Sequence, residues 1–146
     1  MKKSTLIKQH DIRDCGAACL ASVSAHYGLK MPIAKIRQLC HTDTRGTNVL
    51  GLVQGLEQMG FNAKGVKGGT DALPEIPLPA IAHVIVKDQL HHFVVIYKVS
   101  KEKIHFMDPA FGKIEEYSIE EFSKIWTGVL ILMETNAYFE QKNEKT

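Results

Sequence analysis

The chain has 146 residues, of which 45% are hydrophobic and 23% charged, and its net charge is +2. This length suits one domain with a real core, and the dispersed basic residues argue against nucleic acid as a partner. No apolar run approaches the ~20 residues of a membrane span, so we expect no direct membrane insertion. Three cysteines without a secretory signal indicate reduced thiols and a cytoplasmic location.

The first sixty residues predict an extended lead-in over 1–13 and then three helices. Asp11 or Asp14 could cap the first helix, which Gly28 ends. A short second helix has Pro32 in its first turn and runs to residues 39–40. The third helix carries an apolar stripe at helical spacing, and its expected boundaries are a cap at Thr47 or Asn48 and an end at Gly60.

The second half changes to the alternating pattern of strands, which are expected over 61–66, 80–86, 90–99, 104–107, 114–117 and 127–134. A capping box from Ser118 to Glu121 predicts a short helix that runs to Trp126. Helices followed by an antiparallel sheet indicate an α+β fold, with a cleft between the two halves. We expect one domain over 1–134 and a polar tail or linker without a core pattern over 135–146.

Cys15 has the sequence context of a nucleophile. It opens the first expected helix, whose N-terminus favours a thiolate, and Gly16 allows a substrate oxygen to approach the backbone closely. Gln9, six residues earlier, could donate a hydrogen bond to an oxyanion. Cys19 and Cys40 lack this context and are interpreted as packing residues. The Cys-x-x-x-Cys spacing of Cys15 and Cys19 is not that of a zinc or redox pair.

Two neighbouring histidines, His91 and His92, lie in an expected strand, so only one of them can point at Cys15. An antiparallel hairpin would bring Asp108 to their level, where a carboxylate could orient an imidazole. The residues alone leave open which histidine shares the face of Asp108, because the loop length sets the register. Zinc bound by this pair and a cysteine lacks a spacing motif, and no phosphate-binding loop is present. We therefore expect no metal and no cofactor.

Taken together, these motifs resemble a known family. Gln9, Asp14-Cys15-Gly16, Tyr27-Gly28, His92-Phe93-Val94-Val95 and Asp108-Pro109 occur in the order found in bacteriocin-processing peptidase domains. These are papain-like cysteine peptidases at the N-terminus of peptidase-containing ABC transporters, and the resemblance spans about residues 7–133.

The resemblance implies a catalytic role for four residues. Cys15 matches the family's nucleophile, Gln9 its oxyanion donor, His92 rather than His91 its histidine, and Asp108 its orienting acid. It also implies cleavage of leader peptides after a double-glycine-type motif. The expected partners are a leader peptide and the membrane-spanning and ATPase domains of a transporter, with the peptidase on the cytoplasmic side of the membrane.

Two alternatives remain open at this point. The domain could bind leaders for an exporter without cleaving them, as family relatives that lack the cysteine do. It could also be another papain-like cysteine hydrolase or an acyltransferase, with a reactive thiol but no preference for double glycine.

Overall fold

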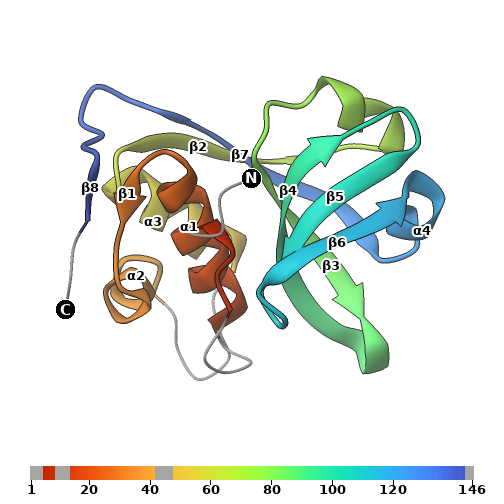
Figure 1. Ribbon diagram of the computed structural model, residues 1–146, viewed down its shortest axis with the longest axis horizontal. Helices are drawn as coiled ribbons and strands as arrows, with labels where there is room; N and C mark the ends of the chain where they lie inside the picture. Colours follow the sequence, from red (N-terminus) through yellow and green to blue (C-terminus); the bar gives the residue numbers. More distant parts are fainter. Residues whose placement is uncertain (1–4, 9–13, 42–47, 144–146) are drawn as a thin grey trace.

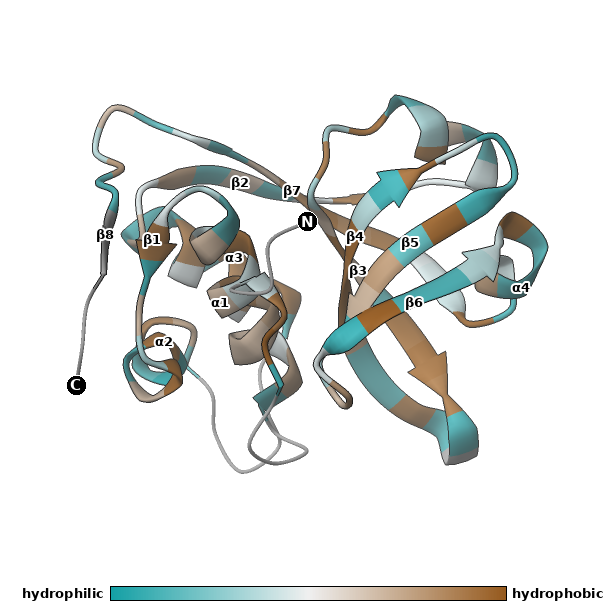
Figure 2. Cartoon of the chain, viewed as in Figure 1, coloured by the Kyte–Doolittle hydropathy of each residue, from teal (hydrophilic) through white to brown (hydrophobic). Residues whose placement is uncertain are grey.

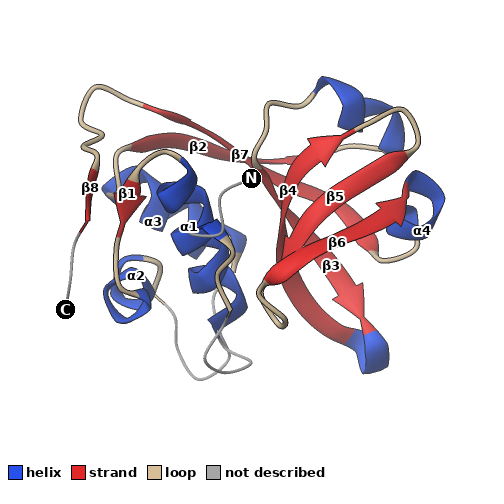
Figure 3. Ribbon diagram, viewed as in Figure 1, coloured by secondary structure: helices blue, strands red, loops and turns tan. Residues whose placement is uncertain are grey.

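The computed structural model describes residues 5–8, 14–41 and 48–143. Three helices gather on one side of the molecule and a strongly curved antiparallel sheet forms the other (Figure 1). The expected α+β fold, with helices first and the sheet second, is therefore confirmed. Figure 3 shows this division, together with the strands β2 and β7, which extend from the sheet across to the helices.

The helical half contains α1 (Cys15–His26), α2 (Ile33–Leu39) and α3 (Val49–Gln58), with the short strand β1 (Leu29–Lys30) between the first two. Small residues let α1 be buried on nearly every side, so it packs closely against both α2 and the sheet. Gly28, at a φ of 99°, ends α1 as expected. Asn48 caps α3 by accepting a hydrogen bond from the Gly51 N–H at 2.8 Å.

The sheet has six strands in the order β2-β7-β3-β4-β5-β6, and every pair is antiparallel. The strands are β2 (Phe61–Lys67), β3 (Ala80–Val86), β4 (Leu90–Val99), β5 (Lys103–Asp108), β6 (Lys113–Ser118) and β7 (Trp126–Thr135). All six lie within about a residue of their expected bounds. The edge strand β6 is mostly hydrophilic (Figure 2), which discourages pairing with another sheet.

Three short helical segments connect the strands: η3 (Thr70–Glu75), η4 (Lys87–Gln89) and α4 (Ile119–Ser123). The capping box expected at Ser118 is present, because Ser118 and Glu121 exchange hydrogen bonds. The prediction that this helix reaches Trp126 is wrong. Trp126 starts β7 instead, and its indole N–H donates to the Val129 carbonyl at 3.0 Å, a contact that a helix would not allow.

Two hydrophobic clusters meet at β4. Phe93 and Val95 belong to the cluster that packs around α1, which we call the helical core. Val94 and Ile96, on the opposite face, belong to the cluster enclosed by the curved sheet and α4, which we call the sheet core. Cys19 and Cys40 are fully buried in the helical core, as packing residues should be.

The chain after β7 turns back over the helical half and pairs with β1 as the short strand β8 (Lys142–Asn143) (Figure 1). Phe139 packs on Tyr27 and Phe61, with ring centroids 6.3 and 5.0 Å away, and Gln141 donates to the Tyr27 carbonyl at 3.0 Å. Phe139 therefore packs against the helical core, although the sequence after residue 134 shows no core pattern. One aromatic in a polar stretch has no periodicity that could reveal its burial.

Candidate active site

Cys15 is the first residue of α1, where the helix meets the sheet. Its side chain is partly exposed and packs against the edge of the helical core, so the thiol is both supported and reachable. The N–H groups in the first turn of a helix have no intrahelical partner, and their positive potential favours a thiolate. The start of α1 therefore places the candidate nucleophile, and an acid–base partner must come from another element.

His92 and Asp108 come from neighbouring strands and contact each other directly. In the register of β4 and β5, Val95 lies opposite Met107, which places Asp108 opposite Val94 and on the same face as His92. His92 Nε2 lies 2.7 Å from Asp108 Oδ1. The Ala110 N–H also donates to Oδ1, at 2.9 Å, and so holds the carboxylate at the end of its strand.

The same His92 ring also interacts with Cys15, so the three side chains form one chain of contacts. Burial lowers the pKa of His92, but the hydrogen bonds to Asp108 and Cys15 outweigh burial and raise this pKa to about 9. Burial acts to raise the pKa of Asp108, yet the bonds from His92 and the Ala110 N–H lower it overall. The arrangement therefore favours an imidazolium held between the Asp108 carboxylate and the Cys15 sulfur.

His91 points elsewhere. It is exposed, and its Nδ1 lies 3.1 Å from Nε2 of His83, whose other ring nitrogen contacts the Thr127 hydroxyl at 3.0 Å. Burial and the neighbouring His91 lower the pKa of His83. Of the two candidate histidines, the structure therefore brings His92 to Cys15 and Asp108 and leaves His91 in a separate contact.

Cys19 lies one turn after Cys15 and is buried. Burial, reinforced by the charges of Cys15 and Asp108, raises its pKa well above the ordinary thiol value, so Cys19 stays a neutral thiol. Within the part of the chain that the structure describes, no three histidine, cysteine or carboxylate side chains gather in a way that could hold a metal ion.

Asp14 occupies the N-cap position of α1, but the expectation that its side chain caps the helix is wrong. It makes no capping hydrogen bond. Both of its oxygens instead accept from Arg37 of α2, Oδ1 from Nε and Oδ2 from Nη2, each at 2.6 Å. Sequence reasoning missed Arg37 because the partners lie 23 residues apart and no local pattern links them.

Gln9 lies outside the described residues. The residues just before it are held beside the turn that follows Asp108. The Ile7 N–H contacts the Met107 sulfur at 3.1 Å, and a Cβ on Gly112 would lie 2.8 Å from the Lys8 Cβ. Residues 7 and 8 therefore lie beside the end of β5, where Asp108 is located.

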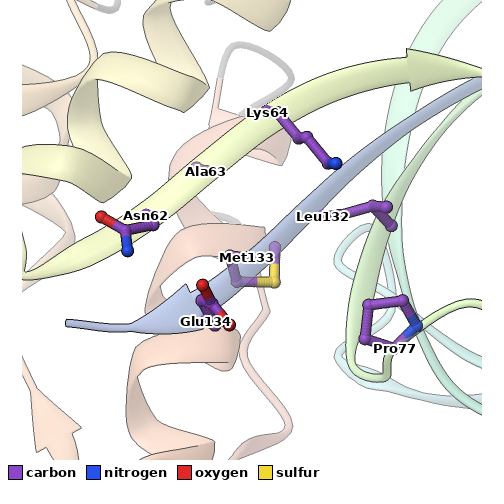
Figure 4. Close-up of a pocket in the computed structure, with 7 residues that line it drawn as sticks. All are labelled: Asn62, Ala63, Lys64, Pro77, Leu132, Met133 and Glu134. Atoms are coloured by element: carbon purple, nitrogen blue, oxygen red, sulfur yellow. The ribbon is translucent and has the colours of Figure 1, made fainter.

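A separate hollow of about 400 Å³ lies on β2 and β7 (Figure 4). Its lining includes Lys64, Leu132, Glu134 and Pro77, and it involves none of Cys15, His92 and Asp108. Pairing across β2 and β7 sets Lys64 opposite Leu132, so this hollow mixes charged and apolar side chains. We assign the reactive groups to the junction of α1 with β4 and β5, not to this hollow.

A helix-borne cysteine that faces a histidine and an acid on an antiparallel sheet defines the papain-like class of cysteine peptidase. A profile of the Peptidase C39 family matches residues 3–138, and the chain belongs to this family. No helix within the described ranges is long and apolar enough to cross a bilayer.

Curated relatives include transport proteins from bacteria. The chain is 43% identical over 147 residues to the lactococcin-G-processing and transport ATP-binding protein LagD of Lactococcus lactis. It is 37% identical over 142 residues to the transport/processing ATP-binding protein ComA of Streptococcus pneumoniae. These matches cover 99% and 92% of the chain, but the chain spans only about a fifth of each relative's length.

Solved structures agree with this assignment. The peptidase domain of Streptococcus ComA superposes with a TM-score of 0.83 at 35% identity, covering 89% of this chain and 97% of that one. A double-glycine-motif protease from an AMS/PCAT transporter, solved with its leader peptide, gives a TM-score of 0.82 at 30% identity. That match covers 89% of this chain and 90% of the other.

Proposed function

We propose that this domain is a cysteine endopeptidase that removes leader peptides after a double-glycine-type motif from secreted, bacteriocin-like precursors. The contact of His92 with both Asp108 and Cys15 carries the proposal, because it supplies an activated thiol with its acid–base partner. The relatives' names, which describe lactococcin processing and a double-glycine protease bound to a leader, support this substrate class. Coupling to the membrane-spanning and ATPase domains of an ABC transporter, with the peptidase on the cytoplasmic side, is part of the same proposal.

In the proposed reaction, the Cys15 thiolate attacks the carbonyl carbon of the second glycine and forms a C–S bond. The Cys15 backbone N–H and the Gln9 amide stabilise the oxyanion. The intermediate then collapses, the peptide C–N bond breaks, and His92 gives its proton to the leaving amine. His92 next takes a proton from water, which hydrolyses the thioester and releases the leader with a free carboxylate.

Asp108 fixes the tautomer and orientation of His92. Its bond occupies Nε2, so Nδ1 is the ring nitrogen left to exchange a proton with Cys15 and the substrate. A domain that only bound leaders would need neither this pair nor a reachable thiol. The geometry therefore favours catalysis over the docking alternative.

A cleavage assay tests the proposal. The protein is incubated with a leader–core peptide, and the products are followed by mass spectrometry. We expect a cut directly after the double glycine, no cut when both glycines are replaced by leucine, and at least a ~10³-fold loss of rate in Cys15→Ala. Cys40→Ala, which removes a thiol that is buried in the helical core, is the matched control and should keep its activity. Cleavage by Cys15→Ala at the parent rate would refute the assignment.

The two histidines offer a second comparison in the same assay. His92→Ala should lose at least ~100-fold in kcat, because it removes the general acid and base. His91→Ala should cleave nearly as fast as the parent, since its ring contacts His83 and not Cys15. Loss of turnover in His91→Ala alone would reverse the assignment.

A further inference from the structure

Arg37 and Asp14 form an ion pair directly beside the nucleophile. Asp14 precedes Cys15 in the chain and is only 1% exposed, while the Arg37 side chain is 36% exposed at the surface of α2. The pairing is bidentate, which is the strongest geometry that a guanidinium and a carboxylate adopt. A surface arginine thus reaches inward to hold a buried carboxylate next to the reactive thiol.

The position of Asp14 makes this pairing unusual. An aspartate at the N-cap normally accepts a hydrogen bond from an N–H group two or three residues further on. Asp14 makes no such bond, because Arg37 occupies both of its oxygens. The N–H groups in the first turn of α1 therefore remain unoccupied by the side chain best placed to bind them.

An unpaired Asp14 would harm the site in two ways. Its carboxylate could turn to cap the first turn and compete with a thiolate or an oxyanion for the same N–H groups. Its negative charge, buried beside Cys15, would also oppose ionisation of the thiol. Among the described residues, the other titratable groups around Cys15 are His92 from β4, Asp108 from β5 and Cys19 from α1.

We propose that Arg37 is a positioning residue for the nucleophile. By holding and neutralising the Asp14 carboxylate, it keeps the first turn of α1 open to the Cys15 thiolate and to the oxyanion. In this proposal Arg37 acts through its ion pair with Asp14 and not on a reacting atom. This inference rests on the proposed peptidase function, because a nucleophile has a role only in a catalytic reaction. It can nevertheless be tested by measuring the reactivity of the Cys15 thiol, without any peptide substrate.

The test is the pH dependence of Cys15 alkylation by iodoacetamide, measured as a rate by mass spectrometry of the Cys15 peptide. In Arg37→Met, we expect the midpoint of the rate profile to rise by about one pH unit, since an unneutralised carboxylate disfavours the thiolate. Arg37→Lys should restore part of this change, because a lysine keeps the charge but not the bidentate bond. Lys30→Met, which removes one exposed positive charge from β1, is the control and should leave the midpoint in place.

The double variant Asp14→Ala/Arg37→Met, which removes both the charge and the capping oxygens of residue 14, separates positioning from a structural role. If Arg37 acts by controlling the Asp14 charge, the midpoint should return toward that of the parent once the charge is gone. A double variant as displaced as Arg37→Met, or an Arg37→Met profile that does not move while the unfolding temperature falls, would overturn the inference. If the parent protein cleaves no double-glycine peptide, the proposed function fails, yet the alkylation profiles still decide the role of Arg37.

Discussion

The chemistry of the site depends on how Asp108 and His92 change each other's proton affinity. Hydrogen bonds from His92 and the Ala110 N–H lower the pKa of Asp108, although burial acts against them. The bonds of His92 to Asp108 and Cys15 overcome burial and raise its pKa from 6.5 to about 9. The pair therefore keeps a proton on the imidazole at neutral pH, as the proposed transfer to the leaving amine requires.

These directions predict how stability changes with pH. The contribution of His92 to the free energy of unfolding is fully present below pH 6.5 and is lost as the pH rises through about 9. The contribution of Asp108 is present above its ordinary pKa of 3.8 and is lost as the pH falls through its lowered value. Asp108→Asn should let the pKa of His92 fall and reduce the free energy of unfolding near pH 6 by about 2 kcal/mol.

Urea denaturation of both proteins at pH 6 and near pH 9.5 measures this effect. The difference between parent and Asp108→Asn should be largest at pH 6 and should shrink at the higher pH. Equal differences at the two pH values would mean that the His92–Asp108 pair is not the source of the stabilisation.

At the scale of elements, the joint between α3 and β2 depends on Gly60. Its φ of 99° lies in the left-handed region, and an added Cβ would lie 2.6 Å from the Cα of Phe139. Backbone cannot move aside as the end of a flexible side chain can. The glycine therefore allows the returning tail to pass directly over the helix end.

Gly60→Ala should lower the free energy of unfolding by about 2 kcal/mol or more, from backbone strain and the contact with Phe139. Gly68→Ala is the matched control. Gly68 does not have a positive φ, and a Cβ added there would lie 3.6 Å from the Cβ of Ala72, an ordinary contact distance. Thermal unfolding of the two variants compares them, and an equal loss in both would contradict this account.

Most elements could be predicted because their signals are local. The short apolar, β-branched runs of β3 and β4 and the capping box at Ser118 are each signals that span a few residues, and the structure has all three elements. The end of α4 could not be predicted in the same way. The indole of Trp126 bonds to Val129 within a strand whose existence depends on pairing with β3.

At the scale of the whole molecule, the tail that follows β7 contacts the end of α1 and the start of β2. Phe139 packs on Tyr27, at the end of α1, and on Phe61, at the start of β2. The Asn136 N–H donates to the Gly60 carbonyl at 2.9 Å. The tail up to Gln141 therefore contributes to the packing of this half, whereas its role as a linker to transporter domains stays a prediction.

Phe139→Ala should reduce the free energy of unfolding by about 2 kcal/mol, less than a fully buried phenylalanine because this ring is only partly covered. Tyr138→Ala changes the neighbouring aromatic, which is 87% exposed, and should change stability by less than about 0.5 kcal/mol. Chemical denaturation of both variants measures the difference. A Phe139→Ala protein as stable as Tyr138→Ala would show that the tail does not support the domain.

The amino-acid sequence alone predicts the α+β class, nearly all of the strands and the set of side chains from which a cysteine peptidase could be built. Local periodicity and the residue types at helix ends are enough for these predictions, because helices and strands depend largely on residues close together in the sequence. The packing of strands and helices settled that His92 rather than His91 meets Asp108, since a shift of one residue in register moves every side chain of a strand to the other face. It also decided that Asp14 binds Arg37 instead of capping α1, because an ion pair between two helices depends on how they pack.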